Sequence, residues 1–147
     1  MSIPLYWSTW NERLYSEIEN FKNNHQESNV LLNNFVCWDK NQAMPTLSAC
    51  ELVWTSFDKP AKIMKKSSTD LERFHPTQKP IYVYQFMFEY CKTQPNDKIL
   101  DTHLGSGSIA IACHDYGFDL TACELDKEYF DKAMQRINNH MAQQKLF

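Results

Sequence analysis

The sequence predicts an α/β fold in which helices cover a parallel sheet. The first observation behind this prediction is that residues 80–147 alternate between helically spaced apolar side chains and short apolar runs, in the order helix, strand, helix, strand, helix. Because two parallel strands need a crossover connection, this alternation is typical of a parallel sheet. The second observation is the pair Gly105 and Gly107, which stands between the apolar run 98–101 and a helical segment.

The part of the chain before residue 80 predicts one helix and two or three strands. Thr9 and Glu12 form the pattern of a capping box. The same segment carries a stripe at helical spacing that consists of Trp7, Trp10, Leu14, Ile18 and Phe21. Strands are expected around Phe35–Trp38 and over 50–57, with a short third strand over 61–64.

The elements after residue 80 follow in a regular order. Pro80 suits the first turn of a helix. A buried strand over 98–101, a helix over 108–116, a strand over 118–125 and a helix over 126–144 come next. The apolar faces of the first and last of these helices consist of Ile81, Tyr84, Phe88 and Cys91, and of Phe130, Met134, Ile137 and Met141.

Length and composition exclude several classes of protein. A chain of 147 residues with 43% hydrophobic residues predicts a single domain, 1–147, with a core of its own. Its net charge of −3 is not that of a free-standing nucleic-acid binder. The five cysteines are odd in number and form no C-x-x-C pair, which predicts reduced, mostly buried thiols in the cytoplasm and no metal site. No segment resembles a signal peptide or a membrane span.

The glycine pair predicts a ligand site. Glycine lets a ligand approach the main chain, and the start of the following helix offers unpaired N–H groups. Glu124 ends the next strand, 23 positions after Asp101, where a carboxylate can accept hydrogen bonds from a ribose. The loop therefore favours a nucleoside-like ligand; the alternative is a tight turn with nothing bound.

Two ligand classes suit such a loop. The run GSGSIA satisfies the dinucleotide pattern of a NAD-type oxidoreductase, but only one more strand and helix follow it. A diphosphate also gains nothing from the carboxylate of Asp101. S-adenosylmethionine carries an ammonium and a sulfonium charge, so electrostatics favour it over NAD.

One family combines these features. The run HPTQKP at 75–80, a helix, ILDTHLGSGS and ACELDKEYF resemble the C-terminal part of the DNA amino-methyltransferases, which use S-adenosylmethionine to methylate adenine N6 or cytosine N4. Their order is that of the circularly permuted β class. The resemblance is strong over 73–137, moderate over the preceding strands and absent over 1–30. It implies a Rossmann-like methyltransferase sheet with helices on both faces, incomplete at its N-terminal side, and a cofactor-binding half over 73–147.

The resemblance also implies roles for single residues. Asp101 would lie near the methionine ammonium, and Glu124 would hold the ribose hydroxyls. The other cofactor-binding residues would be the loop Thr102, His103, Leu104, Gly105, Ser106 and Gly107, the adenine neighbours Leu125 and Asp126, and, at the methionine end, His75, Thr77, Gln78 and Lys79.

The chain departs from the family pattern in two places. The loop usually has Asp-Pro-Phe, whereas Asp101-Thr102-His103 puts an imidazole where an aromatic ring packs on the cofactor. The catalytic motif, Asp/Asn/Ser-Pro-Pro-aromatic, should lie before residue 30, and the chain has no Pro-Pro pair. That motif aims the target amino group and stacks on a flipped base, so the catalytic residues are unknown.

Three explanations of the missing motif remain open. The chain is a truncated or degenerate product that binds cofactor without chemistry, or it is half of a split enzyme whose second polypeptide carries the motif, or residues 1–30 supply a substitute. The expected function is a site-specific DNA methyltransferase, adenine-specific by its resemblance to phage-like members, or its C-terminal cofactor-binding fragment.

DNA is the expected partner. Segment 59–79 holds six basic and two acidic side chains, a local net charge of +4 that could face phosphates; a solvated loop is the alternative. The aromatic side chains Trp38, Trp54 and Phe57 could stack on a flipped base, although core packing is the stronger expectation. Asp39, Lys40 and Glu51 could be polar groups on the substrate side, and nothing in the sequence assigns them.

Overall fold

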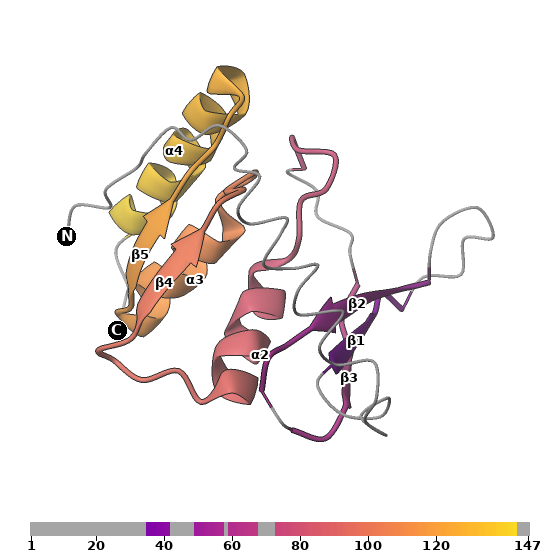
Figure 1. Ribbon diagram of the computed structural model, residues 1–147. Coiled ribbons are helices and arrows are strands. Elements are labelled where there is room, and N and C mark those ends of the chain that lie inside the picture. Colours follow the sequence, from indigo (N-terminus) through magenta and orange to yellow (C-terminus); the bar gives the residue numbers. More distant parts are fainter. Residues whose placement is uncertain (1–34, 42–48, 58, 68–72, 144–147) are drawn as a thin grey trace.

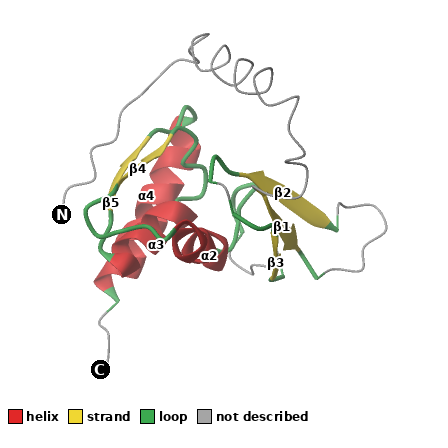
Figure 2. Cartoon of the chain, turned by 60° about the horizontal axis from the view of Figure 1, so that its bottom comes forward, coloured by secondary structure: helices red, strands yellow, loops and turns green. Residues whose placement is uncertain are grey.

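The fold places one helix between two small sheets. The structure is a computed structural model that describes residues 35–41, 49–57, 59–67 and 73–143. In chain order the elements are β1 (Phe35–Asp39), β2 (Cys50–Trp54), β3 (Lys62–Lys65), α2 (Ile81–Cys91), β4 (Lys98–Asp101), α3 (Ser108–Tyr116), β5 (Asp119–Ala122) and α4 (Lys127–Ala142). The three strands before α2 form one sheet, the two strands after it form the other, and α2 lies between them (Figures 1 and 2).

The pairing of β4 with β5 decides where a ligand can bind. The two strands are parallel, with Lys98 opposite Asp119 and Asp101 opposite Ala122. The parallel pairing is possible because α3 supplies the crossover between them. Consequently both strands end at the same edge of the sheet, and the residues that follow Asp101 and Ala122 emerge side by side.

The first sheet is mixed. Its order is β2-β1-β3, with β1 antiparallel to β2 and parallel to β3. Val36 and Trp38 of β1 are buried and alternate with half-buried neighbours, so one face of the sheet forms a core. The indole Nε1 of Trp38 donates to the carbonyl of Lys66 at 2.7 Å, which satisfies the polar atom of this buried ring.

Helix α2 contributes to two apolar cores. Its Phe88 packs in a cluster with α3, β5 and α4. On another face, α2 contributes to a second cluster, which consists of Val36, Trp38, Met64, Val83 and Tyr90. A helix that is apolar on more than one face is buried between layers, and α2 is accordingly the element that joins the two sheets.

The elements predicted over the described residues are present. β2 ends at Trp54, before the predicted residue 57, and β4 is not buried as predicted, because its Leu100 is 67% exposed. β5 is shorter than predicted and ends at Ala122, because the chain then turns to bring Glu124 toward the loop after β4. Both views show α3 and α4 on the same side of the β4–β5 pair, so helices on the second face stay a prediction. The predicted helix over 9–21 lies outside the described residues. Within the described part of the chain, no helix is long and apolar enough to cross a membrane.

Two glycines flank α3 in almost the same left-handed conformation. The φ angles of Gly107 and Gly117 are 74° and 72°. A Cβ atom at Gly107 would stand 3.0 Å from Cδ1 of Ile137 in α4, whereas one at Gly117 would meet nothing within 4 Å. Gly107 therefore lies so close to α4 that no room remains for a side chain.

Alanine substitutions at the two glycines distinguish the conformational cost of a side chain from the cost of a steric clash. Gly117→Ala should lower the free energy of unfolding by about 1–2 kcal/mol, which is the conformational cost of a side chain in the left-handed region. Gly107→Ala should lower it further, because the new methyl group must also displace Ile137. Chemical denaturation of both variants beside the parent chain measures the difference, and equal losses would show that Ile137 moves without cost.

Candidate functional site

A pocket opens where β4 and β5 end. Its cavity volume is about 320 Å³. It is lined by the loop after β4, by the second residue after β5, by one side chain of α2 and by segment 75–79; these residues are His75, Thr77, Lys79, Tyr84, His103, Leu104, Gly105, Ser106 and Glu124. Open α/β sheets bind ligands in the crevice beyond the carboxyl ends of their strands, which is where this pocket lies.

The carboxylate of Glu124 shapes one wall of the pocket. Its Oε2 accepts a hydrogen bond from the backbone N–H of Gly105 at 2.7 Å, and its Oε1 accepts one from the backbone N–H of Asp126 at 3.0 Å. The N–H of Leu104 donates to the carbonyl of Cys123 at 2.8 Å, so the glycine loop is attached to the chain after β5 at two points. A carboxylate has about four acceptor sites, so each oxygen can still accept from a ligand.

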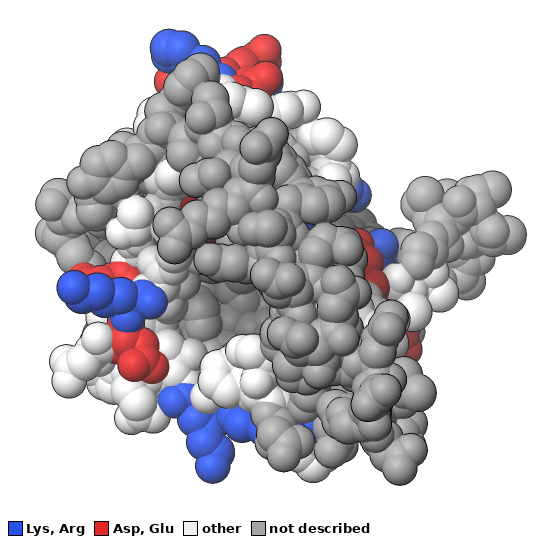
Figure 3. All heavy atoms as spheres, viewed as in Figure 1, with Lys and Arg blue, Asp and Glu red and all other residues white. Residues whose placement is uncertain are grey.

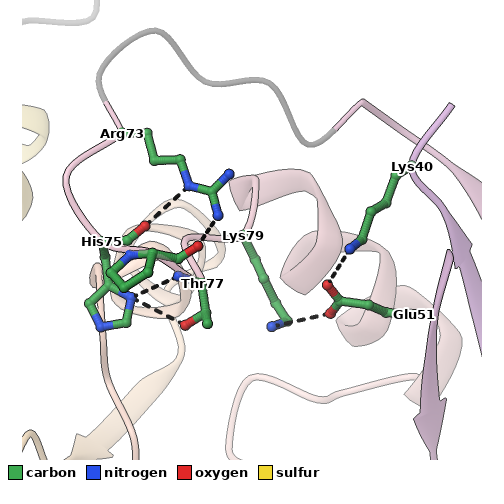
Figure 4. A network of polar contacts seen from close by, with 7 residues as sticks. Lys40, Glu51, Arg73, His75, Thr77 and Lys79 are labelled. Carbon is green, nitrogen blue, oxygen red and sulfur yellow. Dashed lines mark hydrogen bonds and ion pairs between the residues drawn. The ribbon is translucent and has the colours of Figure 1, made fainter. Parts of the chain in front are cut away.

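Segment 73–79 covers the glycine loop from the other side. The imidazole of His75 packs against Tyr129, with ring centroids 4.3 Å apart, and would lie 3.5 Å from a Cβ atom at Gly105. Its Nδ1 lies 3.2 Å from Oγ1 of Thr77. Arg73 donates to the carbonyls of His75 and Pro76, which fixes the turn that these residues form (Figure 4).

A partly buried polar cluster connects the glycine loop with the segment before α2. Arg136 of α4 donates to the carbonyl of Ser106 at 3.0 Å and to Oγ of Ser108 at 2.8 Å. The hydroxyl of Ser108 in turn donates to the carbonyl of Lys79 at 2.7 Å. Hydrogen bonds from a charged donor are stronger than those between neutral groups, so Arg136 holds the glycine loop and the segment before α2 in register.

An ion cluster joins the pocket to the first sheet. Glu51 of β2 lies with Oε1 at 2.8 Å from Nζ of Lys40 and with Oε2 at 3.4 Å from Nζ of Lys79 (Figure 4). Burial by itself raises the pKa of Glu51, but the hydrogen bond from Lys40 and the charges of both lysines outweigh it, so the pKa lies below its usual value. The carboxylate is therefore ionised at neutral pH.

Tyr84 of α2 lines the pocket between these groups. Burial, together with the negative charges of Asp101 and Glu51, raises the pKa of Tyr84 to about 12. The phenol is accordingly neutral at physiological pH and can donate or accept a hydrogen bond. Both carboxylates thus act electrostatically on a side chain inside the pocket.

The structure gathers most of the predicted cofactor residues at the pocket. His75, Thr77, Lys79, Glu124 and the loop from His103 to Ser106 line it. The place of Tyr84 on an apolar helical face predicts a core residue, but Tyr84 lines the pocket. Arg136 could not be found from the sequence, because one arginine on an amphipathic helix carries no signal of its own.

The remaining predicted residues surround the pocket without lining it. Oδ1 of Asp101 accepts from the N–H of His103 at 2.9 Å, and Oγ1 of Thr102 lies 2.9 Å from Nδ1 of the same histidine. The amide oxygen of buried Gln78 accepts from the N–H of Phe74 at 3.3 Å, which braces the loop. Their roles toward a ligand stay predictions.

Three further residues on the predicted list lie around α4. Gly107 packs on Ile137, as described above. The carboxylate of Asp126 caps α4 by accepting from the N–H of Tyr129 at 3.0 Å. Leu125, beside Glu124, is 59% exposed, an unusual exposure for a leucine next to a pocket. Contact of Leu125 and Asp126 with an adenine ring stays a prediction as well.

The basic segment does not form one patch in the described residues. Lys59 donates to a backbone carbonyl of α2, Lys79 pairs with an acid of β2, and Arg73 donates to carbonyls of its own loop. Lys62 and Lys65 are exposed on β3. On the face that Figure 3 shows, the described lysines and arginines lie in separate groups, several of them beside acidic side chains.

The aromatic and sulfur-containing residues differ in burial. Trp38 packs in the second core and is 1% exposed, as expected. Core packing is wrong for Trp54 and Phe57, which are 68% and 43% exposed; Trp54 stands at an exposed position of the alternating strand β2. Cys113 and Cys123 are buried, but Cys50 is exposed, so burial of the thiols is only partly as expected. Among the described residues, no group of three or more His, Cys, Asp or Glu side chains could hold a metal ion.

Comparison with known proteins gives consistent results. A family model described as DNA methylase matches residues 8–135. The Type II methyltransferase M2.LlaDCHI of Lactococcus lactis subsp. cremoris is 34% identical over 86 residues, which are 58% of this chain and 29% of that protein. The Type II methyltransferase M1.MboII of Moraxella bovis is 28% identical over 114 residues, 78% of this chain and 42% of that protein. The chain thus spans less than half the length of either relative.

A solved structure confirms the Rossmann-like fold class. The crystal structure of the M1.HpyAVI–SAM complex matches with a TM-score of 0.61 and 29% sequence identity, over 88% of this chain and 72% of that one. The family match covers far more than half of the chain, and the segments that line the pocket fall within it. The chain therefore belongs to the DNA methylase family, the S-adenosylmethionine-dependent amino-methyltransferases of the β class.

Proposed function

We propose that the pocket binds S-adenosylmethionine and that the chain is the cofactor-binding part of a site-specific DNA methyltransferase that acts on adenine. The observation that carries this proposal is the pocket itself, which joins the glycine loop, Glu124 and segment 75–79 in one site. Family membership supports the cofactor. The adenine target rests on the resemblance to phage-like members, and the division into a partial domain 1–147 with a cofactor half at 73–147 rests on the same resemblance.

The polar groups of the pocket suit this cofactor. Glu124 offers acceptors for the ribose hydroxyls while its oxygens hold the main chain of the loop. Lys79 offers an ammonium group for the methionine carboxylate, and Asp101 a carboxylate near the methionine ammonium. His103 stands where the family usually has an aromatic ring, so its imidazole would stack on the cofactor. A diphosphate would meet the carboxylates of Glu124 and Asp101, which disfavours NAD.

Methyl transfer needs residues beyond this pocket. Bound S-adenosylmethionine supplies a methyl group made electrophilic by its sulfonium charge, and the target is an exocyclic amine. The sequence has no Pro-Pro motif to aim that amine. Cofactor binding is therefore the function proposed for the chain alone. Catalysis is proposed only for a form in which a second polypeptide or a substitute within residues 1–30 aims the base.

Calorimetric titration tests the cofactor first. The purified chain should bind S-adenosylhomocysteine saturably and should not bind NADH, because the pocket offers acidic acceptors where a diphosphate would lie. The homocysteine product is the safer probe because it cannot transfer a methyl group during the measurement. Binding of NADH alone would replace the proposed cofactor by a dinucleotide.

The role of Glu124 can be measured with a matched control. Glu124→Ala should weaken S-adenosylhomocysteine binding by about 1.5–3 kcal/mol, because the ribose loses a charged acceptor. The N–H of Gly105 loses its partner in the same variant, so the loop also loosens. Glu128→Ala removes the same charge from the exposed face of α4 and should leave affinity unchanged. If the two variants bind equally well, Glu124 has no place in the site.

DNA as partner rests on the family and on two lysines. Lys62 and Lys65 are exposed on β3, the edge strand of the first sheet. Lysines on an edge strand also prevent unwanted strand pairing, which is the structural alternative to phosphate contacts. The two readings differ in their dependence on salt, because only phosphate contacts release counterions.

Replacing both lysines by alanine distinguishes the readings. The double variant should bind duplex DNA more weakly at every sequence, and the slope of log affinity against log salt should fall by about 2 in magnitude. A control that removes Lys127 and Lys132 from α4 changes the net charge equally. The same loss in both double variants would mean that only overall charge matters and that β3 does not contact phosphates.

A further inference from the structure

Glu51 belongs to no motif of the sequence, yet the structure connects it with the pocket. It lies on β2, directly opposite Trp38 of β1. Its Oε2 lies 3.4 Å from Nζ of Lys79, which lines the pocket. The strands before the cofactor half therefore reach the cofactor pocket through one carboxylate.

Both partners of this contact are held in place by other groups. Lys40 is only 14% exposed, contacts the other oxygen of Glu51, and has its ammonium 5.6 Å from the ring centroid of Trp38. On the opposite side, the carbonyl of Lys79 accepts from the hydroxyl of Ser108. Lys40 thus holds Glu51, and Ser108 holds the backbone of Lys79. The contact with Glu51 restricts where the ammonium of Lys79 lies, so less side-chain entropy is lost when a ligand binds.

The alternative is that the Glu51–Lys79 pair merely fastens the first sheet to α2. Two observations disfavour this reading. The side chains of Glu51 and Lys79 remain 38% and 33% exposed, and ion pairs at that exposure contribute little to stability. The charge of Glu51 also raises the pKa of Tyr84 inside the pocket, after burial and the charge of Asp101. The electrostatic influence of Glu51 therefore extends into the ligand's space.

The three side chains form a row of alternating charge, positive at Lys40, negative at Glu51 and positive at Lys79 (Figure 4). Lys79, at one end of this row, lines the pocket, whereas Glu51 and Lys40 do not. A ligand carboxylate can therefore approach Lys79. A ligand that ends in a neutral group would gain nothing from its charge.

We propose that Glu51 is a specificity-determining residue that makes the pocket select ligands with an amino-acid carboxylate, by holding the ammonium of Lys79 where that carboxylate binds. The inference rests on the proposed binding of a sulfur-containing adenosyl amino acid. It assigns to the first sheet a part of the cofactor site for which the sequence gives no signal.

Two probes that share the nucleoside and differ in the amino acid test this role. S-adenosylhomocysteine carries the zwitterion, whereas 5′-methylthioadenosine ends in a methyl thioether. Glu51→Gln should weaken binding of the first roughly 3- to 10-fold and leave binding of the second unchanged. Glu89→Gln, which removes an exposed carboxylate of α2 that is paired with Tyr116, is the matched control and should change neither affinity.

Lys79→Met gives an independent measurement should Glu51→Gln fold poorly. It should lower the preference for S-adenosylhomocysteine over 5′-methylthioadenosine, and combining it with Glu51→Gln should add little, because the two residues act as a unit. Equal weakening of both probes by Glu51→Gln, or tighter binding of S-adenosylhomocysteine, would overturn the role of Glu51 and leave the proposed function standing. Failure of the parent chain to bind either probe would overturn the proposed function and this inference with it.

Discussion

The pocket depends on the hydrogen bonds that the carboxylate of Glu124 accepts. The glycine loop follows β4 and Glu124 follows β5, and the hydrogen bond from Gly105 joins the two segments at 2.7 Å. A second backbone donor, at Asp126, fixes the other oxygen and with it the start of α4. One side chain thus sets the distance between the two loops that a ligand must bridge. This arrangement requires the strands to be parallel neighbours, because only then do both loops leave the sheet at the same edge.

Local patterns in the sequence predicted the helices and strands after residue 80 well. β4 coincides with the run at 98–101 and α3 with 108–116, since an apolar strand, a glycine loop and a helix of small residues leave little choice of conformation. The C-terminal glycine of α3 is left-handed, as the end of that helix requires. The motif residues at 75–79 also line the pocket, so a pattern spread over residues 75–124 predicted most of the pocket lining.

Contacts set by the register between strands could not be predicted in this way. Glu51 and Lys40 come together because β1 and β2 pair with Trp38 opposite Glu51, and nothing in either strand alone specifies that register. The net positive charge of segment 59–79 also does not indicate that Lys59 donates to a carbonyl of α2 or that Lys79 lies beside Glu51. Spacing on a helix likewise assigned Tyr84 to the core, although it also borders the pocket.

The position of α2 between two cores has a consequence for how the molecule responds to a ligand. Phe88 packs with the elements around the glycine loop, while Val83 and Tyr90 of the same helix pack with the first sheet. Any displacement of α2 must therefore disturb both cores, so neither sheet can open while the other stays intact. A ligand that binds at the glycine loop should therefore also stabilise β1, β2 and β3 against unfolding, although these strands do not line the pocket. We therefore expect the two sheets to unfold as one cooperative unit, even though no hydrogen bond between strands of the described residues joins them.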